Sequence, residues 1–128
     1  MHFDHAGIAT RDAESLVFLF EDLLGVGVAH EEWFEGMKLV FLEVGEGYLE
    51  IIEPTDEEGT IANYLDREGP GIHHLAFATD DIASALSRAR AHDVRLIDET
   101  PRPGAWGHTV AFLHPESTGG VLVEFVEH

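Results

Sequence analysis

Two copies of one short pattern decide the fold of this chain: DHAGIATRDA at residues 4–13 and HHLAFATDDI at residues 73–82. Each copy has a polar residue and a His, then alternating apolar and small residues, then Ala-Thr and an Asp. Alternation is typical of a strand, and the Asp can cap a following helix because its carboxylate accepts the free N–H groups at a helix start. The repeat therefore predicts a strand followed by a helix in each half of the chain.

The pattern continues in the same order beyond each copy. Helical apolar spacing covers residues 16–24 and 82–91. Strand patterns then cover residues 37–44 and 48–52 in the first half, and 109–113 and 121–126 in the second. We therefore expect one α+β domain of two βαβββ repeats, at about 1–54 and 71–128, joined by a linker at 55–70 with a short helix. The paired repeats would form a curved mixed sheet around a metal site.

Composition limits the classes of function. The 128 residues include 25 acidic and 7 basic ones, for a net charge of −18, and 45% are hydrophobic. A chain this acidic lacks the basic face that nucleic acids and anionic membranes require. Its apolar runs are too short to span a bilayer. We expect a cytoplasmic protein whose charge is an adaptation to high salt, because counterions screen self-repulsion. The alternative is an acidic surface that serves a basic partner.

Four residues recur at equivalent places in the two halves. His5 and His74 each open the first strand of a half, and Glu50 and Glu124 each lie in its last strand. A strand His is on its own more often a core residue than a ligand, and a strand Glu is usually solvated. Both Glu residues have apolar neighbours on their own face, however, and a buried carboxylate needs a partner. Since the chain has no Cys, we predict a divalent metal held by these two His and two Glu residues.

His73 competes with His74 for this role. Neighbouring strand residues point to opposite faces, so only one of the two can enter the site. The alignment with His5 favours His74.

The residues resemble the vicinal-oxygen-chelate superfamily, which includes glyoxalases and bleomycin-resistance proteins. Within it the chain is most similar to the methylmalonyl-CoA epimerases. The matching stretches cover nearly the whole chain and are residues 4–9, 59–65, 71–77 and 112–124. The runs GIHHLAF and FLHPESTGGVLVE are the more specific of these, whereas the opening DHAGIA is common across the superfamily.

The resemblance implies paired βαβββ modules in a homodimer, and a divalent ion at His5, Glu50, His74 and Glu124. The ion is often cobalt in this family, with Mn²⁺, Zn²⁺, Ni²⁺ or Mg²⁺ as alternatives. The implied reaction interconverts the (R) and (S) forms of methylmalonyl-CoA, an acyl-CoA substrate. The metal would stabilise the enolate that forms when the C2 proton leaves.

The chain departs from the family's pattern at the residue that moves the proton. Some members carry a Glu on the first long strand, where this chain has Leu39. We predict Glu124 with Glu50 as the catalytic pair. His108 and Trp106, in a loop before a strand, are candidates for substrate binding, although a loop His and a large aromatic residue often have no such role.

Two other functions remain open. One is another metalloenzyme of the superfamily, either a glyoxalase-type isomerase or lyase or an extradiol dioxygenase. A dioxygenase uses two His and one carboxylate, so a fourth protein ligand argues against it. The other is a metal-free module that binds a small ligand.

Overall fold

A computed structural model describes residues 1–128, which divide into two compact units. The first unit is residues 6–73, and the second unit is residues 1–5 together with 74–128. The elements in chain order are β1 (His2–Ala9), α1 (Ala13–Leu24), β2 (Gly27–Phe34), β3 (Met37–Val44), β4 (Gly47–Pro54), α2 (Thr60–Glu68), β5 (Gly71–Ala78), α3 (Ile82–Ala91), β6 (Arg102–Pro103), the 3₁₀ turn η1 (Ala105–Gly107), β7 (Thr109–Leu113), the 3₁₀ turn η2 (Pro115–Ser117) and β8 (Val123–Glu127). None of the helices has the length and apolar character that crossing a membrane requires.

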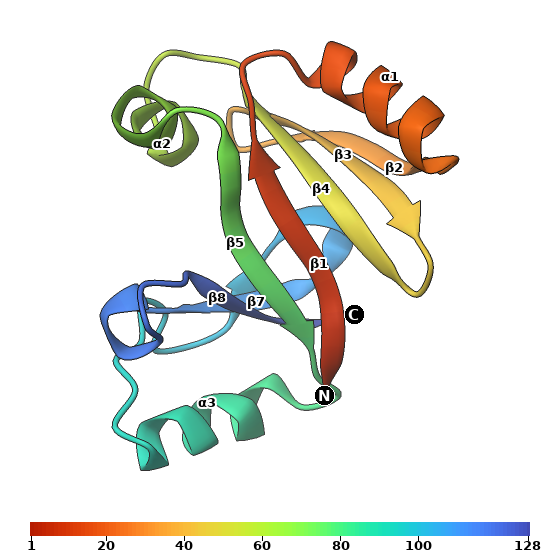
Figure 1. Cartoon of the computed structure of the whole chain (residues 1–128). Helices are drawn as coiled ribbons and strands as arrows, with labels where there is room; N and C mark the ends of the chain where they lie inside the picture. Colours follow the sequence, from red (N-terminus) through yellow and green to blue (C-terminus); the bar gives the residue numbers. More distant parts are fainter. The chain divides into compact units, whose positions relative to one another are not determined.

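In the first unit, α1 covers one face of an antiparallel meander of β2, β3 and β4 (Figure 1). Apolar residues fill the space between the helix and the sheet, and the fully buried ones are Ala13, Val40, Leu42 and Ile51. Because side chains alternate along a strand, Leu39, Phe41 and Glu50 lie on the face turned away from α1. The face that carries Glu50 is therefore separate from the helix-covered core of this unit.

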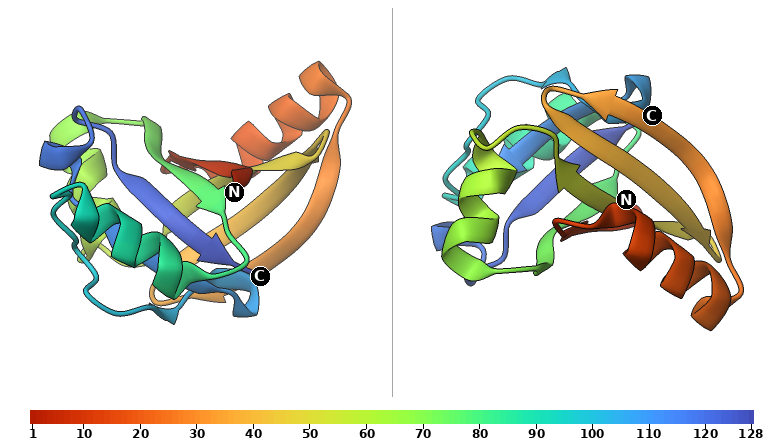
Figure 2. Two further views of the ribbon diagram at one scale, coloured as in Figure 1. Left: turned by 90° about the horizontal axis from the view of Figure 1, so that it is seen from below. Right: turned by 90° about the horizontal axis from the view of Figure 1, so that it is seen from above.

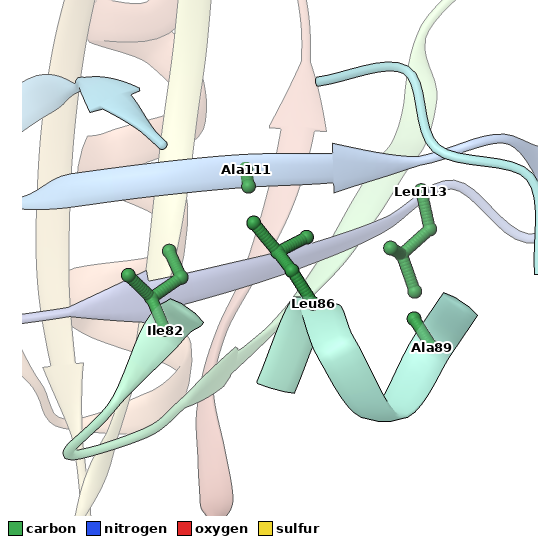
Figure 3. Close-up of a cluster of buried hydrophobic side chains, with 5 residues drawn as sticks. All are labelled: Ile82, Leu86, Ala89, Ala111 and Leu113. Carbon is green, nitrogen blue, oxygen red and sulfur yellow. The ribbon is translucent and has the colours of Figure 1, made fainter. Parts of the chain in front are cut away.

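In the second unit, α3 covers a mixed sheet in which β5 pairs parallel with β8, and β8 and β6 each pair antiparallel with β7. Figure 2 shows α3 beside β8, and Figure 3 shows the buried side chains between α3 and β7. These are Ile82, Leu86, Ala89, Ala111 and Leu113, with Val123 and Phe125 of β8 packed against them. Glu124 and Val126 therefore lie on the face turned away from α3.

The same hydrogen bonds anchor the helix of each half. The Asp12 carboxylate caps α1 by accepting from the Ser15 N–H, and Asp81 caps α3 by accepting from Ser84. A Glu from the last strand of each half accepts the first helical N–H. Ala13 donates to Glu53 at 2.7 Å, and Ile82 donates to Glu127 at 2.8 Å. Each helix start is therefore tied to the strand that carries Glu50 or Glu124.

The predicted α+β class with a mixed sheet and two βαβββ repeats is confirmed. The strands predicted at 37–44 and 109–113 have those bounds, and the helix predicted in the linker is α2, Thr60–Glu68. The prediction that the last strand begins at residue 121 is wrong, because it begins at Val123. Gly119 and Gly120 have positive φ, and Thr118 bonds the Val121 carbonyl, so the preceding loop extends two residues further. That the chain is one domain, with repeats at about 1–54 and 71–128 and a linker at 55–70, stays a prediction.

Candidate metal centre

Three polar side chains converge in the second unit. The Nε2 atoms of His5 and His74 lie 3.2 Å apart, and each lies 3.2 Å from Oε1 of Glu124. The three residues are 5%, 5% and 6% exposed. They form a buried triangle of two imidazole nitrogens and one carboxylate oxygen.

Strand register explains how two of the three meet. Ala76 of β5 pairs with Glu124 of β8, so His74, two residues before Ala76, shares a face with Glu124. Ala76 presents only a methyl group there, which leaves space for the imidazole. Across β7 and β8, Phe112 pairs with Glu124, and its ring packs edge-on against His74 at 5.7 Å. The pattern of β5 and β8 thus determines which side chains enter the site.

Glu124 is the electrostatically unusual member of the triangle. Its Oε1 is buried and has no hydrogen-bond partner, although both imidazoles lie within ion-pair distance. Burial raises the pKa of this carboxyl, but the imidazoles of His5 and His74 lower it by more, so its pKa lies below the ordinary value. The folded chain therefore holds a buried carboxylate whose oxygen lacks a donor, which costs several kcal/mol, about 3–5, when nothing compensates the charge.

Asp4 supports His5 from behind. Its Oδ2 lies 2.7 Å from Nδ1 of His5, and it is itself 5% exposed. A carboxylate only accepts hydrogen bonds, so Nδ1 of His5 carries a hydrogen and donates it to Asp4. In the neutral imidazole, this tautomer leaves Nε2 as the nitrogen that can bind a metal. Carboxylate–histidine pairs of this kind orient metal-binding imidazoles.

The other oxygen of Asp4 is bound to His128. Nε2 of His128 lies 2.6 Å from Oδ1 of Asp4. The two imidazoles hold the pKa of the Asp4 carboxyl below its ordinary value, although burial alone would raise it. The His128 ring stacks on His108 at 3.9 Å between centroids, and His108 stacks on Trp106 at 5.6 Å.

The triangle fits a divalent cation. The two Nε2 atoms and Oε1, which lie 3.2 Å apart, can all bind one ion at about 2.0–2.1 Å, the usual Zn–N distance. Two imidazoles with one carboxylate suit first-row divalent metals and leave coordination positions for water or substrate. A cation also satisfies the carboxylate oxygen that has no donor.

Three of the predicted site residues lie together in the second unit. His5, His74 and Glu124 meet, whereas His73 packs its ring against Tyr64 at 4.9 Å in the first unit. Glu50 is buried on β4 of the first unit, opposite Phe41 of β3. His108 and Trp106 lie in the aromatic stack that ends on His128.

Sequence reasoning missed Asp4 and His128. A signal existed for each, because Asp4 directly precedes the predicted ligand His5, and His128 follows the predicted ligand Glu124 by four residues, an even spacing. Neither signal indicates that the Asp4 carboxylate contacts both His5 and His128.

Comparison with known proteins gives consistent matches over almost the whole chain. Residues 4–112 match the model of the glyoxalase/bleomycin resistance protein/dioxygenase superfamily. The chain is 36% identical to the uncharacterized protein YqjC of Bacillus subtilis, over 97% of this chain and 90% of that protein. It is 35% identical to the mitochondrial methylmalonyl-CoA epimerase of Dictyostelium discoideum, over 97% of this chain and 76% of that protein.

Solved structures agree. A variant of the Streptomyces coelicolor methylmalonyl-CoA epimerase in complex with 2-nitronate-propionyl-CoA superposes with a TM-score of 0.93 at 34% identity. The match covers 99% of this chain and 94% of that chain.

Proposed function

The chain belongs to the glyoxalase/bleomycin resistance protein/dioxygenase superfamily, and on that premise we propose that it is a metal-dependent methylmalonyl-CoA epimerase. The reaction interconverts the (R) and (S) forms by removing and returning the C2 proton through an enolate. Relatives with this activity in their names are among those that match nearly the full chain.

The single observation that carries the proposal is the buried Oε1 of Glu124, without a donor, between two imidazole nitrogens. A hydrophobic core does not retain such a group unless something compensates it. His5, His74 and Glu124 would hold a divalent ion, which supplies a Lewis acid for negative charge that develops on the thioester oxygen. The acidity of a proton beside a thioester depends on that stabilisation.

The residues of the chain have distinct tasks in this proposal. Asp4 fixes the tautomer of His5, and the lowered pKa of Glu124 keeps it ionised, as both cation binding and proton acceptance require. The Phe112 ring packs against His74 and provides a hydrocarbon surface beside this candidate ligand. A dry surrounding strengthens every electrostatic interaction with the substrate.

Glu50 remains a proposed fourth ligand and the second proton carrier with Glu124. The support is its equivalence to Glu124. Each is buried in the last strand of its half, pairs with a Phe on the neighbouring strand and lies on the face turned away from the helix. Proton transfer by a positioned carboxylate contributes about 10²–10⁴-fold to such reactions.

His108 and Trp106 remain proposed substrate-binding residues, with acyl-CoA as the substrate class. Their stacked rings are partly exposed and end on the Asp4–His128 pair of the second unit. A planar stack of this kind offers a face to a thioester or a donor to a carboxylate.

We also keep Co²⁺ as the native metal, the cytoplasm as the location and a homodimer as the working form. For the dimer, the chain offers Phe18, Leu19 and Leu23 of α1, which are 65%, 54% and 67% exposed. Apolar residues gathered on one helix favour an interaction surface. Light scattering of the purified protein measures the oligomer directly.

A second candidate is a different metal-dependent reaction of the same superfamily. Leu39 favours it, because it is 2% exposed on the Glu50 face of the first unit, where some epimerases carry a Glu. A leucine cannot move a proton, so the chain needs other groups for that step.

Deuterium exchange separates the two candidates. Metal-loaded protein is incubated with (S)-methylmalonyl-CoA in D₂O, and NMR follows deuterium entry at C2 and the loss of chirality. We expect both with the metal, neither after chelation, and recovery when the metal is returned. Metal-loaded protein that exchanges no deuterium contradicts the epimerase proposal.

A further inference from the structure

The second unit contains a chain of contacts that starts at the exposed surface and ends at a candidate metal ligand. His128 is 47% exposed in its side chain, and its Nε2 contacts Oδ1 of the buried Asp4 at 2.6 Å. The other Asp4 oxygen contacts Nδ1 of His5 at 2.7 Å. Both oxygens of one buried carboxylate are therefore bound by imidazoles.

From these contacts we infer that His128 is a positioning residue for the metal ligand His5 and acts through Asp4. A carboxylate with one bound oxygen can still rotate about its Cβ–Cγ bond. The second contact, from His128, holds Asp4 in the orientation in which Oδ2 accepts from His5. Nε2 of His5 then points at Nε2 of His74 and at Glu124.

The His128 ring is itself held in place. It stacks on His108 with centroids 3.9 Å apart and ring planes 26° apart. The spacing agrees with this geometry, because β8 ends at Glu127 and His128, which directly follows it, lies an even number of residues after Glu124. β8 therefore provides the candidate ligand Glu124, and the residue that directly follows β8 positions a second candidate ligand, His5.

The inference rests on the metal centre of the proposed function and does not need the epimerase reaction. Loss of a group that hydrogen-bonds a metal ligand typically weakens metal affinity by about 10–100-fold. Asp4 contacts His5 directly, so Asp4→Asn should fall in that range. His128 acts one contact further away, and His128→Phe, which keeps a ring for stacking, should weaken binding by roughly threefold to tenfold.

The experiment titrates Co²⁺ into the metal-free full-length protein against a competing chelator and records the visible absorption of bound Co²⁺. The variants are Asp4→Asn, His128→Phe, His128→Gln and the double variant Asp4→Asn/His128→Phe. His92→Phe is the matched control, since it removes an exposed imidazole beyond the end of α3. Thermal unfolding of each metal-free variant shows that it is folded.

We expect His128→Phe to weaken Co²⁺ binding and alter its spectrum, and His128→Gln, which keeps an N–H donor, to restore part of the affinity. His92→Phe should match the parent protein. In the Asp4→Asn background, His128→Phe should add less than about twofold, because residues that act through a shared partner are not additive.

Three results overturn the inference: His128→Phe with the affinity of the parent, a full additional loss in the Asp4→Asn background, or a parent protein that binds no Co²⁺. The last also removes the metal centre of the proposed function. Normal Co²⁺ binding without deuterium exchange would remove the epimerase proposal and leave the role of His128 intact.

Discussion

The two halves of the chain share a scaffold and differ in the support they give to their histidines. In each half, a Glu of the last strand accepts the first N–H of the helix, at 2.7 Å for Glu53 and 2.8 Å for Glu127. In each half, the strand before that one places a Phe opposite the predicted ligand Glu. The repeat has therefore kept the contacts that position the strands.

The residue before each histidine is different. Asp4 precedes His5, is buried and binds its ring nitrogen, whereas His73 precedes His74 and packs on Tyr64. The Asp4 carboxylate is a negative charge that orients the imidazole of the candidate ligand His5. At the equivalent position of the second half, His73 has no carboxylate and contacts the Tyr64 ring. The comparison teaches that a duplicated fold can preserve its strand geometry while the residue beside the equivalent histidine changes from a carboxylate to an imidazole.

Removing the equivalent carboxylates tests the comparison most severely. Glu124→Gln should weaken divalent-metal binding by more than about 100-fold, the upper range for loss of a group that only supports a ligand, because it removes one of the three candidate ligands. Glu50→Gln should do the same if the repeat extends to ligation. Metal content after dialysis and the C2 exchange rate are measured for both.

The two readouts separate the roles of these residues. A Glu50→Gln variant that retains metal but loses exchange would make Glu50 a proton carrier alone. Normal metal content and normal exchange would remove it from the site. Glu31→Gln, an exposed change on β2, is the control.

The same comparison shows which parts of the fold and of the candidate site could be predicted from the sequence. The internal repeat placed His5, His74, Glu50 and Glu124 at equivalent positions, and the alignment with His5 favoured His74 over His73. Contacts between residues that are not repeated had no such signal. Asp4 and His128 are 124 positions apart, and their bond depends on where β1 and β8 come to lie. The loop before β8 was also misjudged, because two glycines delay the strand.

The scaffold contacts should be equivalent in energy. Glu53→Ala and Glu127→Ala each remove the acceptor of a helix-starting N–H, and each should lower the free energy of unfolding by about 1–3 kcal/mol. Denaturant titration of the metal-free protein measures both. The matched Gln variants keep an acceptor oxygen and should lose less. A large loss at one position and none at the other would show that the repeat conserves geometry without conserving energy.

A fall in pH should lower the stability of the second unit through protonation of Asp4. Its folded-state pKa lies below the ordinary value of about 3.9, so the unfolded chain takes up a proton at higher pH than the folded chain does. The stabilisation is therefore fully present above about pH 4 and is lost as pH falls through the lowered pKa. Unfolding of the metal-free protein between about pH 5 and pH 2 should be less steep in pH for Asp4→Asn. An unchanged slope would contradict the role of the imidazole contacts.

Salt should have the smallest effect and should separate the two units. The first unit has 16 acidic and 3 basic residues, and the second has 9 and 4, so the first carries the greater share of the net charge of −18. Lowering the ionic strength from about 1 M to about 0.01 M lengthens the Debye length from about 3 Å to about 30 Å, which exposes each unit to its own repulsion. Amide hydrogen exchange should therefore speed up more in peptides of β2 and β3 than in those of α3 and β8, because local opening relieves the larger repulsion. A neutral osmolyte at matched osmolarity is the control, since it changes exclusion from the surface without screening charge. Equal acceleration in both units would mean that local charge density does not determine which part of the protein opens first.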